Sequence, residues 1–342
     1  MPDFCKTSPW PPPNPSSMTP ALSVVVPCYN EAGVLWQLHE RLTDACKEVV
    51  HDDFQIVLVD DGSSDTTWTL INELAAQNPR VLGISLSRNH GHQLALAAGL
   101  SWCSGERVLV IDADLQDPPE LLGPMMGLMD DGADVVFGQR ASRLGETRFK
   151  KTTASLFYRL LTRLTDVPIS RDSGDFRLMS RRVVDLVNAM PEQHRFVRGM
   201  VSWVGFRQVP LLYERKERLT GVTKYPFKRM LNFAIDAITG FSVTPLRVAS
   251  GFGILFGLAG MAGLVYALGS WFAGVTVAGW TSVVIIMLIL GSAQLLVLGI
   301  IGEYLGRLYM ESKHRPLYVI DQIIGQSGSA RAGEPAQQDH PR

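Results

Sequence analysis

Two carboxylates one residue apart, Asp112 and Asp114, directly follow an apolar run at 107–111 that has the composition of a buried parallel strand. In open α/β sheets, ligands bind where strands end. Carboxylates this close repel each other unless a cation lies between them. Mg²⁺ or Mn²⁺, which prefer oxygen ligands, would relieve that repulsion and would also hold a diphosphate. Spacing alone favours the alternative of a solvated acidic turn.

Two further strand ends carry polar turns of the same kind. The apolar run 22–27 leads into Cys28-Tyr29-Asn30-Glu31, and the run 54–59 leads into the acidic turn 60–65. Helical patterns separate these strands from others at 81–86, 134–138 and 206–213, which indicates βαβ units and a parallel sheet. Three polar turns at one sheet edge favour a ligand site over solvated turns. No GxGxxG or GxxxxGK[ST] motif supports a dinucleotide dehydrogenase or a P-loop enzyme.

The amino-acid composition indicates which kinds of binding partner and site the chain could have. Charged residues make up 19% of the 342 residues and the net charge is −1, so nothing points to nucleic acid. The four cysteines lack CxxC spacing, which favours reduced thiols over a zinc site or a disulfide framework. Residues 1–20 are rich in proline and predict a disordered leader without the apolar core of a secretory signal.

The stretch 248–302 contains no Asp, Glu, Lys, Arg or His. It accommodates two transmembrane helices, predicted at 246–272 and 280–304; a buried pair of soluble helices is the alternative. Basic residues flank both outer ends and the turn has none, which predicts a cytoplasmic catalytic domain on the inner (plasma) membrane. Before the spans, 226–244 predicts an interfacial amphipathic helix, with an ordinary surface helix as the alternative. After them, 305–342 is predicted to be a cytoplasmic tail.

Another candidate site residue, Asp175, lies in the stretch 171–179 close to Arg177. An Asp beside an Arg in a cleft acts as a base or as an orienting partner, and a structural ion pair is the alternative. A basic loop at 214–225 follows the strand predicted at 206–213.

The runs 26–31, 60–65 and 112–120 resemble those of the family 2 glycosyltransferases, which have a GT-A fold. With Asp172-Ser173-Gly174-Asp175-Phe176-Arg177 and the loop 221–227, the chain is similar to the polyprenyl-phosphate branch, which includes bactoprenol (undecaprenyl-phosphate) glucosyltransferases and dolichyl-phosphate mannose synthases. The resemblance covers about residues 22 to 320 and excludes the leader. It implies a GT-A Rossmann-like α/β catalytic domain at 21–225, followed by the interfacial helix and the two spans.

The resemblance also implies a role for each matching residue. The catalytic residues would be Asp114, Asp175 and Arg177. The metal, Mg²⁺ or Mn²⁺, would be held by Asp112, Asp114 and Gln116. The lipid phosphate would be bound by Arg140 and Arg177. The nucleotide-sugar would be bound by Pro27, Tyr29, Glu31, Asp60, Asp112, Arg215, Arg218 and Lys224.

The implied reaction transfers one hexose, from UDP-glucose, to undecaprenyl phosphate with inversion. A phosphate monoester is largely ionised at neutral pH, which weakens the need for a strong base, so Asp175 is either a base or an orienting group. Gln193-His194-Arg195-Phe196 does not match the Gln-x-x-Arg-Trp motif of processive synthases, which favours single-sugar transfer. GDP-mannose, UDP-GlcNAc or an aminopentose donor and a non-catalytic membrane scaffold are the alternatives. The uncharged spans disfavour a transporter, and their glycines permit a homo-oligomer.

Overall fold

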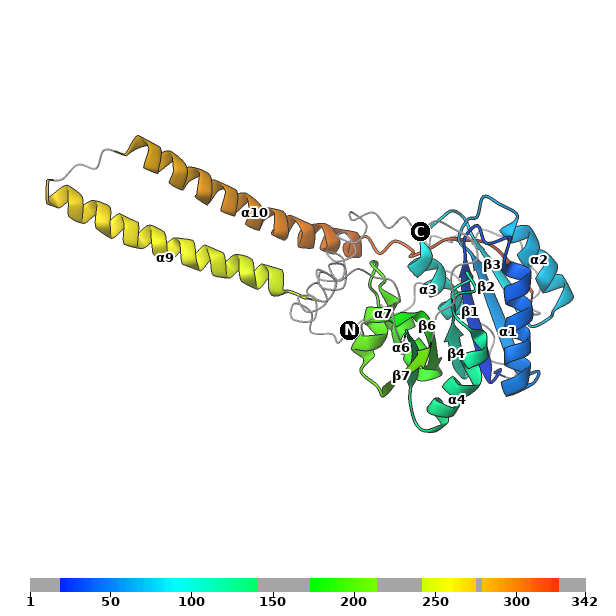
Figure 1. The fold of residues 1–342 in the computed structure, drawn as a ribbon. Coiled ribbons are helices and arrows are strands. Elements are labelled where there is room, and N and C mark those ends of the chain that lie inside the picture. The colour runs from blue at the N-terminus through cyan, green and yellow to red at the C-terminus, as the bar shows by residue number, and fades with distance from the viewer. Residues whose placement is uncertain (1–18, 141–172, 214–241, 275–278, 326–342) are drawn as a thin grey trace, which may run out of the picture.

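The computed structural model describes residues 19–140, 173–213, 242–274 and 279–325. Within them, eight strands form one sheet in the order β7-β5-β6-β4-β1-β2-β3-β8. The strands are β1 (Leu22–Cys28), β2 (Phe54–Asp60), β3 (Val81–Leu86), β4 (Arg107–Val110), β5 (Val135–Arg140), β6 (Ser173–Ser180), β7 (Gln208–Tyr213) and β8 (Ile320–Ile324). Figure 1 shows this α/β domain at one end of the molecule and a long helical hairpin at the other.

Helices cover both faces of the sheet. They are α1 (Leu35–Val50), α2 (Thr67–Gln77), α3 (His92–Trp102), η1 (Pro119–Leu121), α4 (Leu122–Asp130), α6 (Arg181–Ala189) and α7 (Val197–Val204). Apolar side chains of α1, α2 and α4 pack on one face, and those of α3, α6 and α7 pack on the other. β1 and β2 are therefore buried at all seven of their positions, which explains their continuous apolar sequence.

The sheet is mixed, so the prediction of a parallel sheet is confirmed only in part. β3, β2, β1 and β4 are parallel neighbours, as the βαβ pattern indicates. β6 instead lies between β4 and β5 and runs antiparallel to both. The direction of a strand depends on where the chain re-enters the sheet, and a short apolar run has the same appearance in either direction.

The strand β8 was not foreseen, since 305–342 was predicted as a tail. It pairs antiparallel with β3, with Ile84 opposite Ile323. The apolar residues of 317–324 cover the otherwise unpaired edge of β3 and satisfy its backbone groups. Only the part of the tail beyond residue 325 lies outside the described residues.

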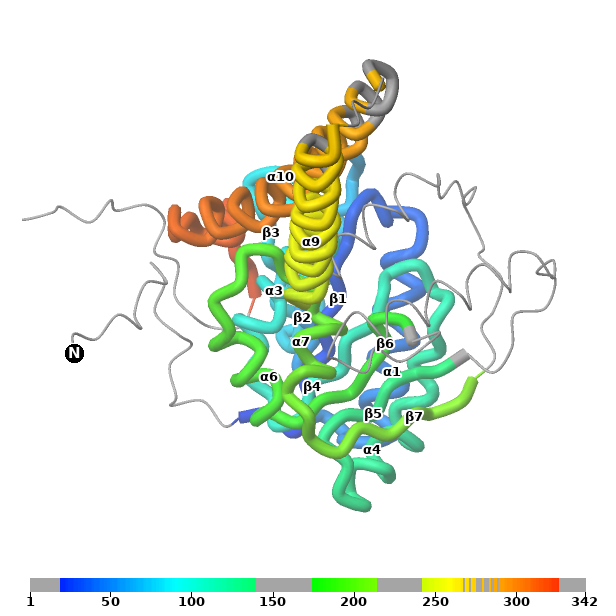
Figure 2. Tube along the Cα trace, turned by 90° about the vertical axis from the view of Figure 1, so that its left-hand side faces the viewer, coloured from blue at the N-terminus to red at the C-terminus, as the bar shows by residue number. Residues whose placement is uncertain are grey.

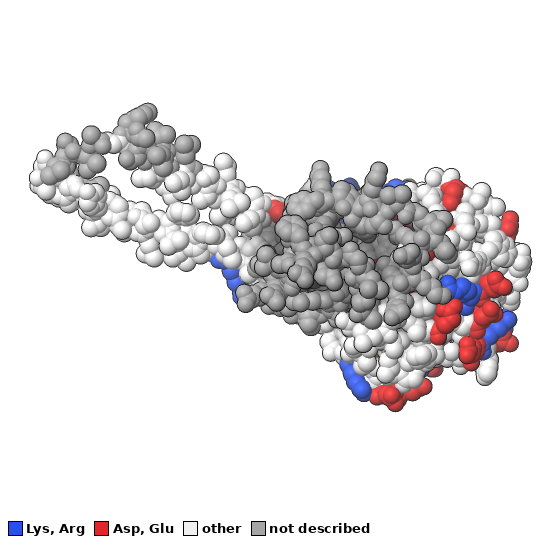
Figure 3. All heavy atoms as spheres, in the orientation of Figure 1, with Lys and Arg blue, Asp and Glu red and all other residues white. Residues whose placement is uncertain are grey.

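Two helices, α9 (Thr244–Phe272) and α10 (Trp280–Ser312), form the hairpin that projects from the domain (Figures 1 and 2). The candidate membrane spans within them have mean hydropathies of 1.9 and 1.5, and at most 6% of their residues are buried. They are long and apolar enough to cross a membrane. Their exposed apolar side chains argue against the alternative of a buried soluble pair. Figure 3 shows almost no charged side chains along the described part of the hairpin.

The predicted spans 246–272 and 280–304 fall within α9 and α10. At the base of the hairpin, the Tyr304 hydroxyl donates a 2.6 Å hydrogen bond to the Ser242 carbonyl oxygen and joins the two helices. Most of the predicted leader (1–18) and interfacial helix (226–241) lie outside the described residues. The predictions for these two segments remain predictions.

Candidate active site

The turns after β1 and β2 are joined by hydrogen bonds. The Asn30 side-chain oxygen accepts a 2.8 Å bond from Ser64 N–H, and Asn30 N–H donates to the Ser63 hydroxyl at 2.9 Å. Glu31 N–H donates to the Thr67 hydroxyl at 2.9 Å. Asparagine is a residue type that often caps helices, but the φ of 55° at Asn30 places it in a left-handed turn, and α1 begins only at Leu35. The two turns thus form one unit at the sheet edge.

Three predicted nucleotide-binding residues lie on or next to this unit. Pro27 is buried in β1, whereas the Tyr29 ring is 47% exposed and Glu31 is half-buried. A buried proline inside the strand shapes the backbone, so the exposed ring of Tyr29 is the better candidate for contact with a flat nucleobase. The structure brings these residues to the same edge as Asp60, whose backbone lies opposite Cys28 in the sheet.

Asp60 and Asp61, at the end of β2, have different partners. Asp60 accepts a 3.3 Å hydrogen bond from Ser63 N–H within its own turn. Asp61 accepts bonds of 2.7 and 2.9 Å from the N–H groups of His90 and Gly91, in the turn before α3. Burial raises the pKa of both carboxyl groups. Asp61 therefore fixes the start of α3, a structural role that its position in the motif did not predict.

The acidic turn, residues 112–117, leaves the end of β4. Asp114 Oδ1 accepts a 3.2 Å hydrogen bond from Gln116 N–H, and Leu115 has a left-handed φ of 58°. Asp112 Oδ1 is buried and has no hydrogen-bond partner within the described part of the chain. Burial raises the pKa of Asp112 to about 6, and the neighbouring carboxylates add to the shift. The positive charge that His92 can carry, 3.5 Å from Asp112 Oδ1, offsets part of this shift. The turn thus presents a carboxylate that has a buried oxygen without a hydrogen bond and whose charge is only partly compensated.

The buried carboxylate of Asp117 lies at the far side of the acidic turn. The Tyr213 hydroxyl, at the end of β7, donates a short hydrogen bond to Asp117 Oδ1. The Tyr213 ring also contacts the Phe176 ring edge-on, with centroids 5.8 Å apart. The hydrogen bond from Tyr213 therefore attaches the end of β7 to the acidic turn.

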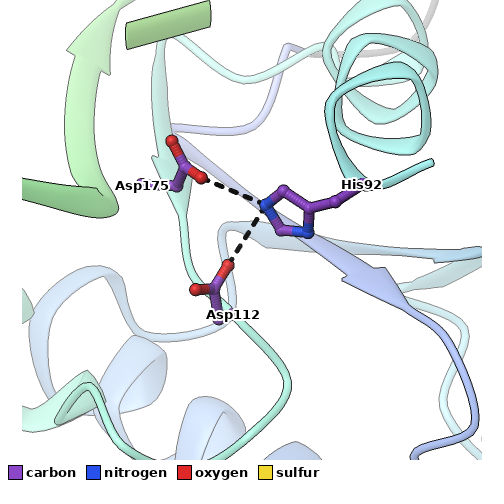
Figure 4. A group of neighbouring side chains, drawn as sticks. All are labelled: His92, Asp112 and Asp175. Carbon is purple, nitrogen blue, oxygen red and sulfur yellow. Dashed lines mark hydrogen bonds and ion pairs between the residues drawn. The ribbon is translucent and has the colours of Figure 1, made fainter. Parts of the chain in front are cut away.

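Asp175 is the centre of a cluster contributed by three elements. His92 Nε2, at the start of α3, lies 3.1 Å from Asp175 Oδ2 and 3.5 Å from Asp112 Oδ1 (Figure 4). Arg198, on α7, donates from Nε to Oδ1 at 2.7 Å and from a terminal nitrogen to Oδ2 at 3.0 Å. Gln93 Nε2 adds a 3.3 Å bond to Oδ2. The Asp175 carboxylate, only 2% exposed, thus accepts four hydrogen bonds.

These contacts decide the charge state of the cluster. Burial disfavours the Asp175 anion, but the hydrogen bond to His92 and the positive charges of Arg198 and Arg177 outweigh it, and the pKa of Asp175 lies well below its usual range. Burial of the His92 ring lowers its pKa, but the bond to Asp175 and the charge of Asp112 raise it further, so the net shift is upward. The two carboxylates that face His92 Nε2 thus favour the protonated form of the ring.

Arg177, the other predicted partner of Asp175, is buried in β6 with an exposed fraction of 4%. Its terminal nitrogen donates to the Gly174 carbonyl oxygen at 3.1 Å, while its Nε is buried without a hydrogen-bond partner among the described residues. Burial lowers its pKa to about 10, so the guanidinium stays protonated at neutral pH. A buried guanidinium of this kind offers positive charge to an anion that enters the site.

Two sets of donors could hold a divalent cation. The oxygens of Asp112, Asp114 and Gln116 leave one turn, and this all-oxygen set with a buried, unbonded Asp112 oxygen fits Mg²⁺ or Mn²⁺. The ligand atoms of His92, Asp112 and Asp175 also lie within 4.8 Å of one another. His92 Nε2 already faces both carboxylates, however, and whenever this nitrogen carries the proton that it shares with them it has no lone pair for a metal. The acidic turn is the better match.

For several predicted site residues, the structure does not describe the side chain. Arg215, Arg218 and Lys224 lie outside the described residues. The backbone of Arg140 ends β5 opposite Tyr213, but its side chain is not described. The other predicted residues lie at the carboxyl-end turns of β1, β2 and β4 or on β6.

Sequence reasoning missed His92, Gln93 and Arg198. The small apolar residues from Ala95 to Ser104 indicate a helix after the third strand, whereas α3 already begins at His92. The polar run Arg88-Asn89-His90-Gly91 has the composition of a turn, and extending it by one residue reaches His92. Arg198 had no local signal, because its partner Asp175 is 23 residues away.

Comparison with known proteins gives a consistent result. Residues 23–187 match the model of glycosyl transferase family 2. The chain is 45% identical over 304 residues to YkcC of Bacillus subtilis (strain 168), an uncharacterized glycosyltransferase, covering 89% of this chain and 94% of that protein. It is 38% identical to the bactoprenol glucosyl transferase of Shigella phage SfV, with 87% and 97% covered. A prophage bactoprenol glucosyl transferase homolog of Escherichia coli is 36% identical, with 88% and 99% covered.

The acidic turn, the turns after β1 and β2 and the Asp175 cluster therefore lie in a chain whose sequence matches glycosyltransferases along nearly their whole length. The chain is a glycosyltransferase and belongs to glycosyl transferase family 2.

Proposed function

We propose that this enzyme is bound to a membrane and transfers a single glucose from UDP-glucose to a polyprenyl phosphate such as undecaprenyl phosphate. The observation that carries the proposal is the full-length similarity to the bactoprenol glucosyl transferases, which includes the region of the apolar helices. The apolar hairpin would keep the enzyme beside a lipid acceptor that cannot leave the bilayer. The enzyme is expected to invert the sugar configuration.

Different turns would bind different parts of the nucleotide-sugar. The nucleotide would lie against the turns after β1 and β2, where Tyr29, Glu31 and Asp60 are close together. The diphosphate would lie at the acidic turn, where Asp112, Asp114 and Gln116 would hold Mg²⁺ or Mn²⁺. The bound ion would neutralise the charge that develops on the diphosphate leaving group. The basic residues Arg215, Arg218 and Lys224 would close over the same group.

The acceptor phosphate would be the nucleophile. Its second pKa is about 6, so it attacks largely as the dianion at neutral pH and needs little proton removal. Asp175 accepts four hydrogen bonds and has a lowered pKa, which makes it a poor base. We therefore assign Asp175 the orienting role, with Arg177 and Arg140 supplying positive charge to the lipid phosphate.

Several other nucleotide-sugars could serve as the donor in place of UDP-glucose. YkcC, at higher identity than the phage protein, is named only as a glycosyltransferase. GDP-mannose, UDP-GlcNAc and an aminopentose nucleotide would use the same turns, since the carboxyl-end edge recognises the diphosphate in every case. Both the similarity to the bactoprenol glucosyl transferases and the apolar hairpin support a lipid carrier as the acceptor.

The test uses membranes that contain the full chain. Radiolabelled UDP-glucose, GDP-mannose and UDP-GlcNAc are supplied separately with undecaprenyl phosphate, and the lipid is extracted and counted with Mn²⁺ or with EDTA. We expect metal-dependent label from UDP-glucose in a lipid that carries one sugar. Label from another donor alone would reassign the sugar, and no lipid label from any donor would refute the lipid-phosphate acceptor.

Orientation is a separate part of the proposal. The basic residues that flank α9 and α10 outside the hairpin predict a cytoplasmic α/β domain and a hairpin turn on the opposite side. Protease treatment of sealed, right-side-out membrane vesicles should leave the α/β domain intact, and treatment of inverted vesicles should degrade it. The opposite pattern would contradict this topology.

A further inference from the structure

One short segment connects the end of the apolar helix α10 with the Asp175 cluster. This segment, residues 193–198, precedes and begins α7 and is named here the brace. It carries Arg198, which forms two hydrogen bonds to Asp175. Its position is fixed by contacts from three other elements, and none of these contacts was visible in the sequence.

The first contact comes from the last turn of α10. Glu311 Oε1 accepts a 2.7 Å hydrogen bond from Gln193 N–H. The Gln193 side chain in turn donates at 2.9 Å to the carbonyl oxygen of Arg315, just beyond the helix. An ionised acceptor makes a stronger hydrogen bond than a neutral one, so Glu311 is the principal anchor at this end.

The middle of the brace is held on α6. Arg195 donates to the Val187 carbonyl oxygen at 2.7 Å and to the Met190 carbonyl oxygen at 2.5 Å. These carbonyls lie at the end of α6, where no helical N–H remains to bond them. The brace is therefore held at Gln193 by α10 and at Arg195 by α6, and Arg198 follows only three residues later.

The third contact comes from Gln93 on α3. Val197 N–H can only donate, so the atom that receives its 2.9 Å bond must be the Gln93 oxygen. The Gln93 nitrogen then faces Asp175 Oδ2 at 3.3 Å. One amide thus joins the first turn of α7 to the carboxylate that Arg198 binds, and both of its ends are in use.

We propose that Glu311 and Gln93 are positioning residues for sugar transfer, which hold Arg198 and Asp175 from the two ends of the brace. Through Glu311, the apolar helix α10 is connected mechanically to the active site. The inference rests on the proposed function for its activity readout, but the contacts themselves can be tested independently. Neither residue touches the substrate in this proposal.

The test compares full-length variants in membranes. Glu311→Ala removes the acceptor of Gln193 N–H, whereas Glu311→Gln keeps an oxygen there. Glu303→Ala is the matched control, because Glu303 lies on the same helix and pairs only with Arg307 among the described residues, at 3.1 Å. We expect Glu311→Ala to lower kcat about tenfold with a donor KM within about twofold, Glu311→Gln to restore most of the loss, and Glu303→Ala to match wild type.

Gln93 is tested from the other side. Gln93→Glu keeps the acceptor for Val197 N–H but replaces the donor to Asp175 with a second carboxylate. We expect kcat to fall at least about tenfold, again with little change in donor KM. Gln37→Glu, on an exposed position of α1, is the control and should have no effect.

Amide hydrogen exchange supplies a readout that needs no sugar transfer. Glu311→Ala should raise exchange across residues 197–204 about five- to tenfold, while Glu303→Ala should not. Equal exchange and kcat in the two variants would overturn the proposal, as would a loss of kcat without a change in α7 exchange. If wild-type protein labels no lipid, the proposed function fails, and the exchange comparison alone decides whether α10 braces α7.

Discussion

The acidic turn after β4 and the Asp175 cluster both contain aspartates at the same edge of the sheet, but the two regions are built in opposite ways. The turn comes from one contiguous run, whereas the cluster is assembled from α3, β6 and α7. Asp112 has a buried oxygen without a hydrogen bond and a pKa raised to about 6, while Asp175 accepts four hydrogen bonds and has a lowered pKa.

This difference indicates different roles for the two regions: the acidic turn is suited to binding a ligand, and the Asp175 cluster is suited to holding the surrounding structure in place. A carboxylate with a buried oxygen that accepts no hydrogen bond is costly to bury and is stabilised by an incoming cation. A carboxylate whose oxygens are filled by protein donors has little capacity left for a ligand, and it holds its neighbours in place instead. We therefore expect substitutions in the turn to affect activity, and substitutions in the cluster to affect stability as well.

The largest effect is expected in the turn. Asp114→Ala should lower transfer about 10³-fold, because it removes charge from the proposed diphosphate site, while the free energy of unfolding changes by less than about 0.5 kcal/mol. Labelled lipid and denaturant unfolding of the detergent-solubilised protein measure the two quantities. Asp53→Ala, at an exposed carboxylate far from the edge, is the control. Full activity of Asp114→Ala would remove the metal assignment.

The cluster should respond differently. Asp175→Asn removes the carboxylate charge that lies beside the buried Arg177 and the partly buried Arg198, so the free energy of unfolding should fall by about 3 kcal/mol. Denaturant midpoints of the solubilised variant and wild type give this value. A variant as stable as wild type but inactive would show that Asp175 acts on the substrate and not as a support, and the comparison with the turn would fail.

Tyr213 tests the connection between the two regions. Tyr213→Phe removes the donor to buried Asp117 but keeps the ring against Phe176, so we expect a loss of about 1–2 kcal/mol in stability. Donor KM should rise severalfold, because the acidic turn loses one fixed point. Tyr309→Phe, on the exposed surface of α10, should change neither quantity. An unchanged KM in Tyr213→Phe would mean that the turn is rigid by itself.

The smallest effect on stability and activity is expected at Glu120, the last residue of the run 112–120. Its carboxylate accepts two 2.9 Å hydrogen bonds from Arg41 on α1 and is 57% exposed. Glu120→Ala should cost less than about 1 kcal/mol in stability and leave kcat within about twofold. A large loss of kcat in enzyme assays would give this residue a role in the site that its contacts do not indicate.

Much of the fold was predictable because it is locally encoded. The apolar runs at 22–27, 54–59 and 81–86 became β1, β2 and β3 with errors of at most one residue. The acidic turn was recognisable for the same reason, since its residues are adjacent. The first residue of a helix was harder to predict. The helical pattern begins near Ala95, three residues after the true start of α3, so His92 and Gln93 were not recognised as site residues.

The parallel core strands, the polar turns at their carboxyl ends, the two long apolar helices and the family resemblance can all be predicted from the order of the residues. Each depends on residues that are close together in the chain, through hydrophobic periodicity or a contiguous motif. The antiparallel direction of β6 and β8, and the arrangement of His92, Gln93 and Arg198 around Asp175, become visible only in the folded structure. Those partners are 23 to 83 residues apart in the chain, and no local pattern specifies which distant donor will reach a buried carboxylate.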